Sequence, residues 1–248
     1  MKNLRAAVRM FLFVAFSLGI YSVWWIFSFF IPNEQFWRQT VFGWWAKFFV
    51  SIARMKVEVA GAPPRPPFFL VSNHLSYMDI PVLRSVLETV FVAKGEVESW
   101  FLAGKIVGDM GTIFINRQNR RDIPRAGAEI LERIGGGEGV TVFPEGTSTN
   151  GEEILKFNSS FLEFAARAHL PVYYVAVSYR TPPTEIPASR AVCWWEDISF
   201  MAHLWRLFQV AETTAMLTFG DEPVLSDDRK ELARKLREKV REKFVPVL

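Results

Sequence analysis

A histidine and an aspartate five residues apart are the first candidates for chemistry in this 248-residue chain. His74 follows the apolar run FFLVS, which is typical of a buried strand, and Asp79 stands at the expected start of the next helix. A tight turn would let the carboxylate reach one ring nitrogen, fix the tautomer and make the other nitrogen more basic, as a general base requires. A loop histidine satisfied by ordinary hydrogen bonds explains these residues equally well.

Two further polar clusters stand where expected strands end. Asn116 and Arg117 close the run GTIFINR, and an arginine there can grip a phosphate with two hydrogen bonds, although a solvated loop arginine is the alternative. The run VFPEGTS brings Glu145, which could bind hydroxyl groups or balance Arg117, together with Gly146 and Thr147; an ordinary turn is the alternative. Because parallel strands end at one edge of a sheet, we expect all three clusters to converge there.

Alternating strands and helices from residue 55 onward must position these clusters. We expect strands at residues 56–59, 68–72, 89–92, 112–115, 139–143, 172–178, 191–195 and 213–219. We expect helices at residues 79–87, 100–107, 122–134, 157–168, 200–208 and 227–244. This alternation predicts one α/β domain over residues 55–248, with a mostly parallel central sheet flanked by helices.

Residues 1–54 predict a membrane-associated anchor of two helices. The uncharged run 10–31 is about 33 Å long as a helix and can cross the apolar core of a bilayer; a buried core helix is the alternative. Residues 34–54 form a cationic amphipathic helix rich in aromatic side chains, suited to the headgroup layer or to packing on the domain. Basic residues flank the run 10–31 on both sides, so we expect a monotopic hairpin rather than a single span.

Composition excludes several classes of protein. With 50% hydrophobic and 22% charged residues, the chain is too apolar to be disordered. The single cysteine, Cys193, excludes an internal disulfide and a cysteine-rich zinc module. A net charge of +3 is too small to indicate nucleic acid and suits an anionic membrane surface. No metal site is expected, because His74, Asp79 and Glu145 are spread over three loops and make poor zinc ligands.

Taken in order, the three clusters resemble the motifs of the glycerolipid acyltransferases, and best of all the 1-acyl-glycerol-3-phosphate O-acyltransferase family. The resemblance covers about residues 71–177 and includes a weakened fourth motif at residues 170–172. It implies that His74 is the general base and that Asp79 orients it. It also implies that the substrate is bound by Asn73, Lys94, Arg117, Glu145, Gly146 and Thr147.

The resemblance implies a direct acyl transfer. His74 would take the proton from the free hydroxyl of a lysophospholipid, most simply 1-acyl-glycerol-3-phosphate, which becomes phosphatidic acid. That oxygen would attack the thioester of an acyl-CoA or of an acyl-carrier protein, and this co-substrate replaces any cofactor. No acyl-enzyme is expected, since there is no Gly-x-Ser-x-Gly motif and Cys193 lies far from the clusters. Backbone amides near His74 are the expected oxyanion donors. A bacterial member would work at the cytoplasmic face of the inner membrane.

Two departures from the family pattern bear on the acceptor. Ser148 stands where an arginine commonly follows Glu-Gly-Thr, and the fourth motif lacks its second proline. Both weaken the case for lysophosphatidate as the acceptor and leave lysophosphatidylethanolamine, lysophosphatidylcholine and lyso-ornithine lipid as alternatives. Two other interpretations remain open: a lipid hydrolase in which His74 activates water, and a membrane adaptor in which His74 is inert. The charged helix 227–244 could dock an acidic carrier protein, or it could simply be a packed helix with a solvated face.

Overall fold

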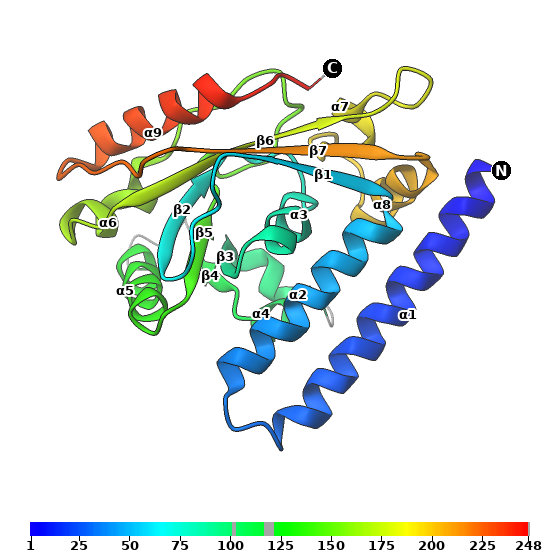
Figure 1. Ribbon diagram of the computed structural model, residues 1–248, viewed down its shortest axis with the longest axis horizontal. Coiled ribbons are helices and arrows are strands. Elements are labelled where there is room, and N and C mark those ends of the chain that lie inside the picture. Colours follow the sequence, from blue (N-terminus) through cyan, green and yellow to red (C-terminus); the bar gives the residue numbers. More distant parts are fainter. Residues whose placement is uncertain (101–102, 117–121, 248) are drawn as a thin grey trace.

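A twisted, mostly parallel sheet organises the protein. The structure, a computed structural model, describes residues 1–100, 103–116 and 122–247 (Figure 1). In these residues one sheet has the strand order β1-β7-β6-β2-β5-β3-β4, and only β6 and β7 pair in antiparallel fashion. The strands are β1 (Met55–Ala60), β2 (Phe68–Ser72), β3 (Thr89–Lys94), β4 (Ile113–Ile115), β5 (Gly139–Val142), β6 (Val172–Arg180) and β7 (Thr213–Phe219). The predicted fold class is confirmed.

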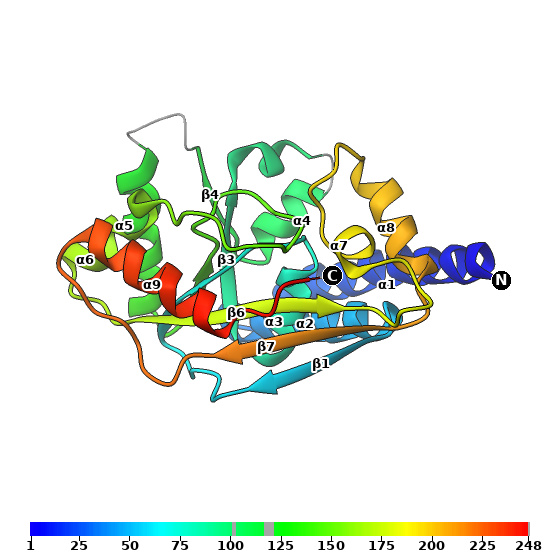
Figure 2. The same cartoon turned by 90° about the horizontal axis from the view of Figure 1, so that it is seen from above.

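Helices cover both faces of this sheet (Figures 1 and 2). The helices are α1 (Lys2–Ser28), α2 (Glu34–Ile52), α3 (Asp79–Val86), α4 (Ala103–Asp109), α5 (Asp122–Gly135), α6 (Glu163–Arg167), α7 (Ala188–Ala191), α8 (Phe200–Gln209) and α9 (Arg229–Lys243), with 3₁₀ turns η1 (Gly95–Ser99) and η2 (Ser159–Leu162). Alternate side chains of β2 enter two separate cores, one shared with α2, α3 and α8 and the other with α5, α6 and α9. Burial on both faces explains why β2 is apolar throughout.

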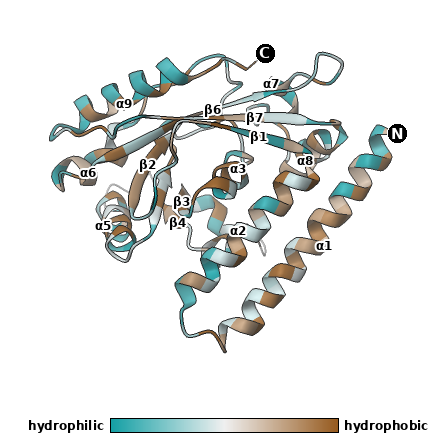
Figure 3. Cartoon of the chain, viewed as in Figure 1, coloured by the Kyte–Doolittle hydropathy of each residue, from teal (hydrophilic) through white to brown (hydrophobic). Residues whose placement is uncertain are grey.

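The first two helices form an antiparallel hairpin along one side of the domain (Figure 1). Helix α2 packs on α3 and has seven buried residues, so the packed-helix alternative holds for this segment. Helix α1 contacts α2 and α8, yet most of its apolar side chains are exposed. Its length and hydropathy suffice to cross a membrane (Figure 3). The hairpin therefore presents a long apolar face while α2 joins the domain core.

Two arginines fasten the start of α1 to the end of α8. The Arg9 guanidinium donates to the backbone oxygens of Phe208, Val210 and Ala211 at 3.2, 2.6 and 3.1 Å, and Arg5 donates to Gln209 O at 2.7 Å. These carbonyls belong to the last turn of α8 and the residues after it, which lack partners within the helix. Arg5 and Arg9, the basic residues that precede the apolar run of α1, are thus bound to the domain itself.

Two predicted elements differ from the structure. The strand predicted at residues 191–195 is wrong: residue 191 ends α7, and a loop follows. Cys193 is buried because this loop packs inside the domain rather than in the sheet, and an apolar run does not distinguish the two. The helix predicted at residues 157–168 is broken into η2 and α6, because the side chain of Asn158 caps a tight turn at Ser160.

Candidate active site

The turn between β2 and α3 brings His74 and Asp79 into direct contact. His74 Nδ1 lies 2.8 Å from Asp79 Oδ2, as the sequence predicted. The Asp79 side chain is fully buried, and its Oδ2 also accepts hydrogen bonds from the backbone nitrogens of Leu75 (2.7 Å) and Ser76 (3.0 Å). The other oxygen, Oδ1, accepts from the Tyr179 hydroxyl at 2.7 Å. A buried carboxylate is thereby satisfied by neutral donors and by one imidazole.

The ring of His74 is held in one orientation. Because a carboxylate can only accept, Nδ1 carries the proton and Nε2 is left as the basic nitrogen. Phe143 stacks on the imidazole with ring centroids 4.3 Å apart and an angle of 20° between the planes. The His74 side chain is 23% exposed. Within the described residues, Nε2 has no hydrogen-bond partner, and it is therefore the atom available to a substrate hydroxyl.

Glu145 binds the backbone of the same turn. Its Oε1 accepts from His74 N at 3.2 Å, and its Oε2 accepts from Leu155 N at 3.4 Å. Burial raises the pKa of Glu145 to about 8, and the charge of Asp79 adds to this rise, whereas the two backbone hydrogen bonds oppose it. The carboxyl group therefore holds a proton over much of the neutral range, beside the base.

The predicted convergence is met by the first and third clusters and by Asn116 of the second. Strands β2, β5, β3 and β4 are parallel, so His74, Glu145 and Asn116 follow strands that end at the same edge of the sheet. Lys94 ends β3 and is exposed. Arg117 lies outside the described residues, two positions beyond the end of β4.

The third cluster forms a tight turn beside His74. Gly146 has a φ of +79°, a conformation that suits glycine, and its backbone nitrogen donates to Phe143 O at 3.1 Å. Thr147 is exposed at the surface of this turn. The next residues are tied down, since the Ser148 hydroxyl donates to Trp194 O and the Thr149 nitrogen donates to His74 O at 3.1 Å.

Two expectations from the sequence need correction. Asn73 was expected to bind substrate, but its side chain is fully buried, donating to Val177 O (2.9 Å) and accepting from Val177 N (2.7 Å). It joins β2 to β6 instead. The backbone nitrogens nearest His74 were expected to stabilise an oxyanion, but those of His74, Leu75 and Ser76 already donate to Glu145 and Asp79. An oxyanion must therefore be stabilised by other donors.

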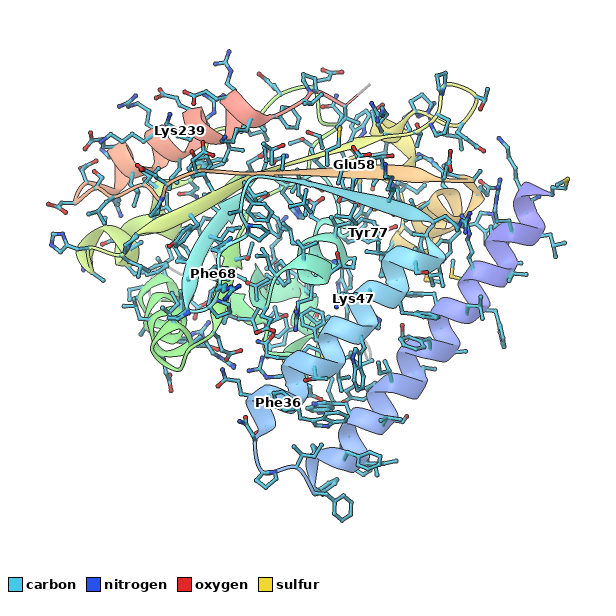
Figure 4. The ribbon with its side chains drawn as sticks, viewed as in Figure 1. Phe36, Lys47, Glu58, Phe68, Tyr77 and Lys239 are labelled. Atoms are coloured by element: carbon cyan, nitrogen blue, oxygen red, sulfur yellow. The ribbon has the colours of Figure 1, made fainter. Side chains whose placement is uncertain are left out.

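A second chain of contacts holds the catalytic turn from the side of α8. Tyr77, on the side of the sheet that α2 covers, donates to His203 Nδ1 at 3.0 Å (Figure 4). His203 Nε2 in turn donates to Cys193 O at 3.0 Å, so His203 is neutral, and burial lowers its pKa to about 4. Trp194 N donates to Leu75 O at 2.8 Å. Nothing in the sequence signalled the Tyr77–His203 and Trp194–Leu75 contacts, because the partners are more than a hundred positions apart.

Comparison with known proteins agrees with this geometry. A family model described as Acyltransferase matches residues 55–179. A lyso-ornithine lipid O-acyltransferase from Pseudomonas aeruginosa is 34% identical over 206 residues, covering 82% of this chain and 78% of that protein. A 1-acyl-sn-glycerol-3-phosphate acyltransferase from Neisseria gonorrhoeae is 32% identical over 183 residues, covering 73% and 71%.

A solved structure shares the fold. The crystal structure of the 1-acyl-sn-glycerophosphate acyltransferase PlsC from Thermotoga maritima matches 98% of this chain and 97% of that chain, with a TM-score of 0.69. Its sequence identity is 20%, so this likeness concerns the fold alone.

The raised pKa of Glu145 predicts how stability depends on pH. The folded chain keeps this proton up to about pH 8, whereas the unfolded carboxyl loses it near its ordinary value of 4.5. The unfolded state therefore binds fewer protons in that window, and the free energy of unfolding falls as pH rises. His203 acts in the opposite direction only between about 4 and its ordinary 6.5. We expect wild type to lose about 1–2 kcal/mol between pH 6.5 and 8 from Glu145 alone.

Denaturant unfolding of Glu145→Gln in detergent checks this prediction. The variant should lack this loss between pH 6.5 and 8, while Glu153→Gln, an exposed residue on the following loop, should follow wild type. Equal slopes for all three proteins would show that Glu145 does not hold a proton in the folded chain.

Proposed function

The chain belongs to the Acyltransferase family, and from this premise we propose that it transfers a fatty acyl group from an acyl thioester to the free hydroxyl of a lysophospholipid. The observation that carries the proposal is the 2.8 Å contact between His74 Nδ1 and the buried Asp79, which leaves Nε2 as a base at a partly exposed position. A base of this kind suits an alcohol acceptor, whose oxygen becomes a nucleophile only as its proton leaves.

The transfer needs no covalent enzyme intermediate. His74 Nε2 takes the hydroxyl proton while the acceptor oxygen forms a bond to the thioester carbonyl carbon. The carbon–sulfur bond then breaks, and the departing thiolate takes the proton back from the imidazolium. Asp79 stabilises the imidazolium in between, and its other hydrogen bonds, from Leu75 N, Ser76 N and the Tyr179 hydroxyl, hold the carboxylate in place. The one cysteine, Cys193, is buried, and burial raises its thiol pKa well above the ordinary value, which argues against a role as nucleophile.

For the acceptor we propose 1-acyl-glycerol-3-phosphate first. Lys94 ends β3 on the edge where His74 lies, and a cation there suits a phosphate. The sequence adds Arg117, two positions after the last residue of β4. Lyso-ornithine lipid is the second candidate, favoured by Ser148. A serine there adds no cation, and its hydroxyl already donates to Trp194 O. Either acyl-CoA or an acyl-carrier protein would serve as donor.

For location we propose a monotopic attachment to the membrane. Helix α1 is held along its length by α2 and α8, and Arg5 and Arg9 hold its start on the domain. A helix in this position offers one apolar face to lipid while the other face packs on protein. In a bacterial cell this attachment would lie on the cytoplasmic face of the inner membrane, where the acyl donors are made.

Replacing His74 by Ala tests the proposed reaction. Loss of the base should lower the rate of acyl transfer at least about 100-fold. His169→Ala is the matched control, because His169 is exposed and pairs with Asp227 away from the site. Purified protein in detergent is given radiolabelled donor with and without acceptor. Donor consumption that does not require an acceptor would indicate a hydrolase, and full activity in the variant would reject His74 as the base.

Position 148 tests the acceptor. Wild type is offered lysophosphatidate, lysophosphatidylethanolamine, lysophosphatidylcholine and lyso-ornithine lipid with each donor. Ser148→Arg should raise the ratio of kcat/KM for lysophosphatidate over lyso-ornithine lipid about 10-fold, since an arginine–phosphate pair is worth about 1.4 kcal/mol or more. Ser148→Ala removes the hydrogen bond to Trp194 without adding charge and should leave the ratio unchanged. If lysophosphatidate is the poorest acceptor of wild type, our first choice is wrong.

Labelling from the two sides of a vesicle tests the monotopic attachment. Lys2 begins α1 and Glu34 begins α2, just beyond the other end of α1, and both are exposed. Each is replaced by Cys, while the native Cys193 is buried and gives little background. In a hairpin, an impermeant maleimide should label both positions from the same side of membrane vesicles. Labelling from opposite sides would show that α1 spans the bilayer.

A further inference from the structure

The side chain of Tyr179 completes the set of contacts around the buried carboxylate. Strand β6 pairs with β2, and Tyr179 lies near its end on the face that looks toward α3. Its hydroxyl donates to Asp79 Oδ1 at 2.7 Å, opposite the oxygen that contacts His74. Tyr179 is 1% exposed and Asp79 is fully buried. No water competes for this hydrogen bond, so its strength is that of a low-dielectric environment.

Within the described residues, Oδ1 of Asp79 accepts one hydrogen bond, from the Tyr179 hydroxyl, whereas Oδ2 accepts three. In this hydrogen bond the Tyr179 hydroxyl is always the donor. Burial and the charge of Asp79 raise the pKa of the phenol well above its ordinary value, so the hydroxyl keeps its proton at every pH at which the enzyme works. The hydrogen bond also fixes the plane of the carboxylate, and this plane aims Oδ2 at the imidazole.

We propose that Tyr179 is a positioning residue that acts on His74 through Asp79 and sets how strongly this carboxylate stabilises the imidazolium. The proposal rests on the proposed function, in which His74 is the base. A donor on Oδ1 compensates part of the negative charge that His74 otherwise experiences at Nδ1. It also removes the rotational freedom of the carboxylate, which lowers the entropy lost when the reacting geometry forms.

This charge compensation determines in which direction the pH profile of kcat/KM moves when the Tyr179 hydroxyl is removed. Without the phenol hydroxyl, the carboxylate presents more uncompensated charge to the imidazole and stabilises its protonated form. The acidic limb of kcat/KM then moves to higher pH. The other groups that face this pair stay in place: Glu145 from the turn after β5, Tyr77 within the catalytic turn, Cys193 from the loop before α8, and Arg237 of α9 beyond Glu145.

Tyr179→Phe removes the hydroxyl and keeps the ring. We expect kcat to fall about 10-fold, the value of one hydrogen bond to a charged group, with the KM of each substrate within about 3-fold. The acidic limb should move up by about half a pH unit or more. Tyr174→Phe is the matched control, because Tyr174 is also buried and lies on the same strand, but packs in the opposite core. It should leave both kcat and the pH profile unchanged.

Tyr179 replaced by 3-fluorotyrosine provides a test that does not remove a group from the core. Its hydroxyl is a stronger donor of nearly the same shape, so the acidic limb should move to lower pH. A lower kcat in Tyr179→Phe with no displacement of the limb would reduce Tyr179 to a packing role and overturn the proposal. A wild type without acyl transfer, or an active His74→Ala, would instead overturn the proposed function.

Discussion

The charge of Asp79, buried without a Lys or Arg partner among the described residues, is the constraint on which the active-site architecture depends. A carboxylate taken out of water has to be satisfied by hydrogen bonds, and each donor here comes from an element that the fold must bring into place. Two backbone nitrogens come from the turn after β2, one hydroxyl comes from β6, and the imidazole completes the set. The pairing of β6 with β2 is therefore also a requirement of the chemistry.

The turn that carries His74 is restrained from three sides. Glu145 holds its backbone from β5, Asn73 ties its first residue to β6, and Tyr77 reaches His203 on α8. The restraint has a cost, because the amides of His74, Leu75 and Ser76 are already used by the two carboxyl groups. These three amides therefore orient the base and are not free to bind an oxyanion.

Local patterns predicted much of this fold from the sequence. The run FFLVS at residues 68–72 matches β2 in full, because a strand buried on both faces is a continuous apolar run with polar residues after it. The pattern failed at residues 191–195, where an apolar loop that contacts α8 through Cys193 has a composition like that of a strand. The His74–Asp79 contact was predictable because a short turn forces it. The Tyr179 and His203 contacts were not, since they depend on pairing between strands and on packing across the sheet rather than on nearby sequence.

The hydrogen bonds from Arg5 and Arg9 to the end of α8 have a consequence for biosynthesis. Arg9 and the carbonyls that it binds are separated by 199 to 202 positions, and β1 likewise pairs with β7 near the other end of the chain. The apolar helix leaves the ribosome long before its partners exist. On the proposed membrane attachment, lipid would receive α1 before the catalytic domain can close onto it, and assembly of this enzyme would begin at the membrane.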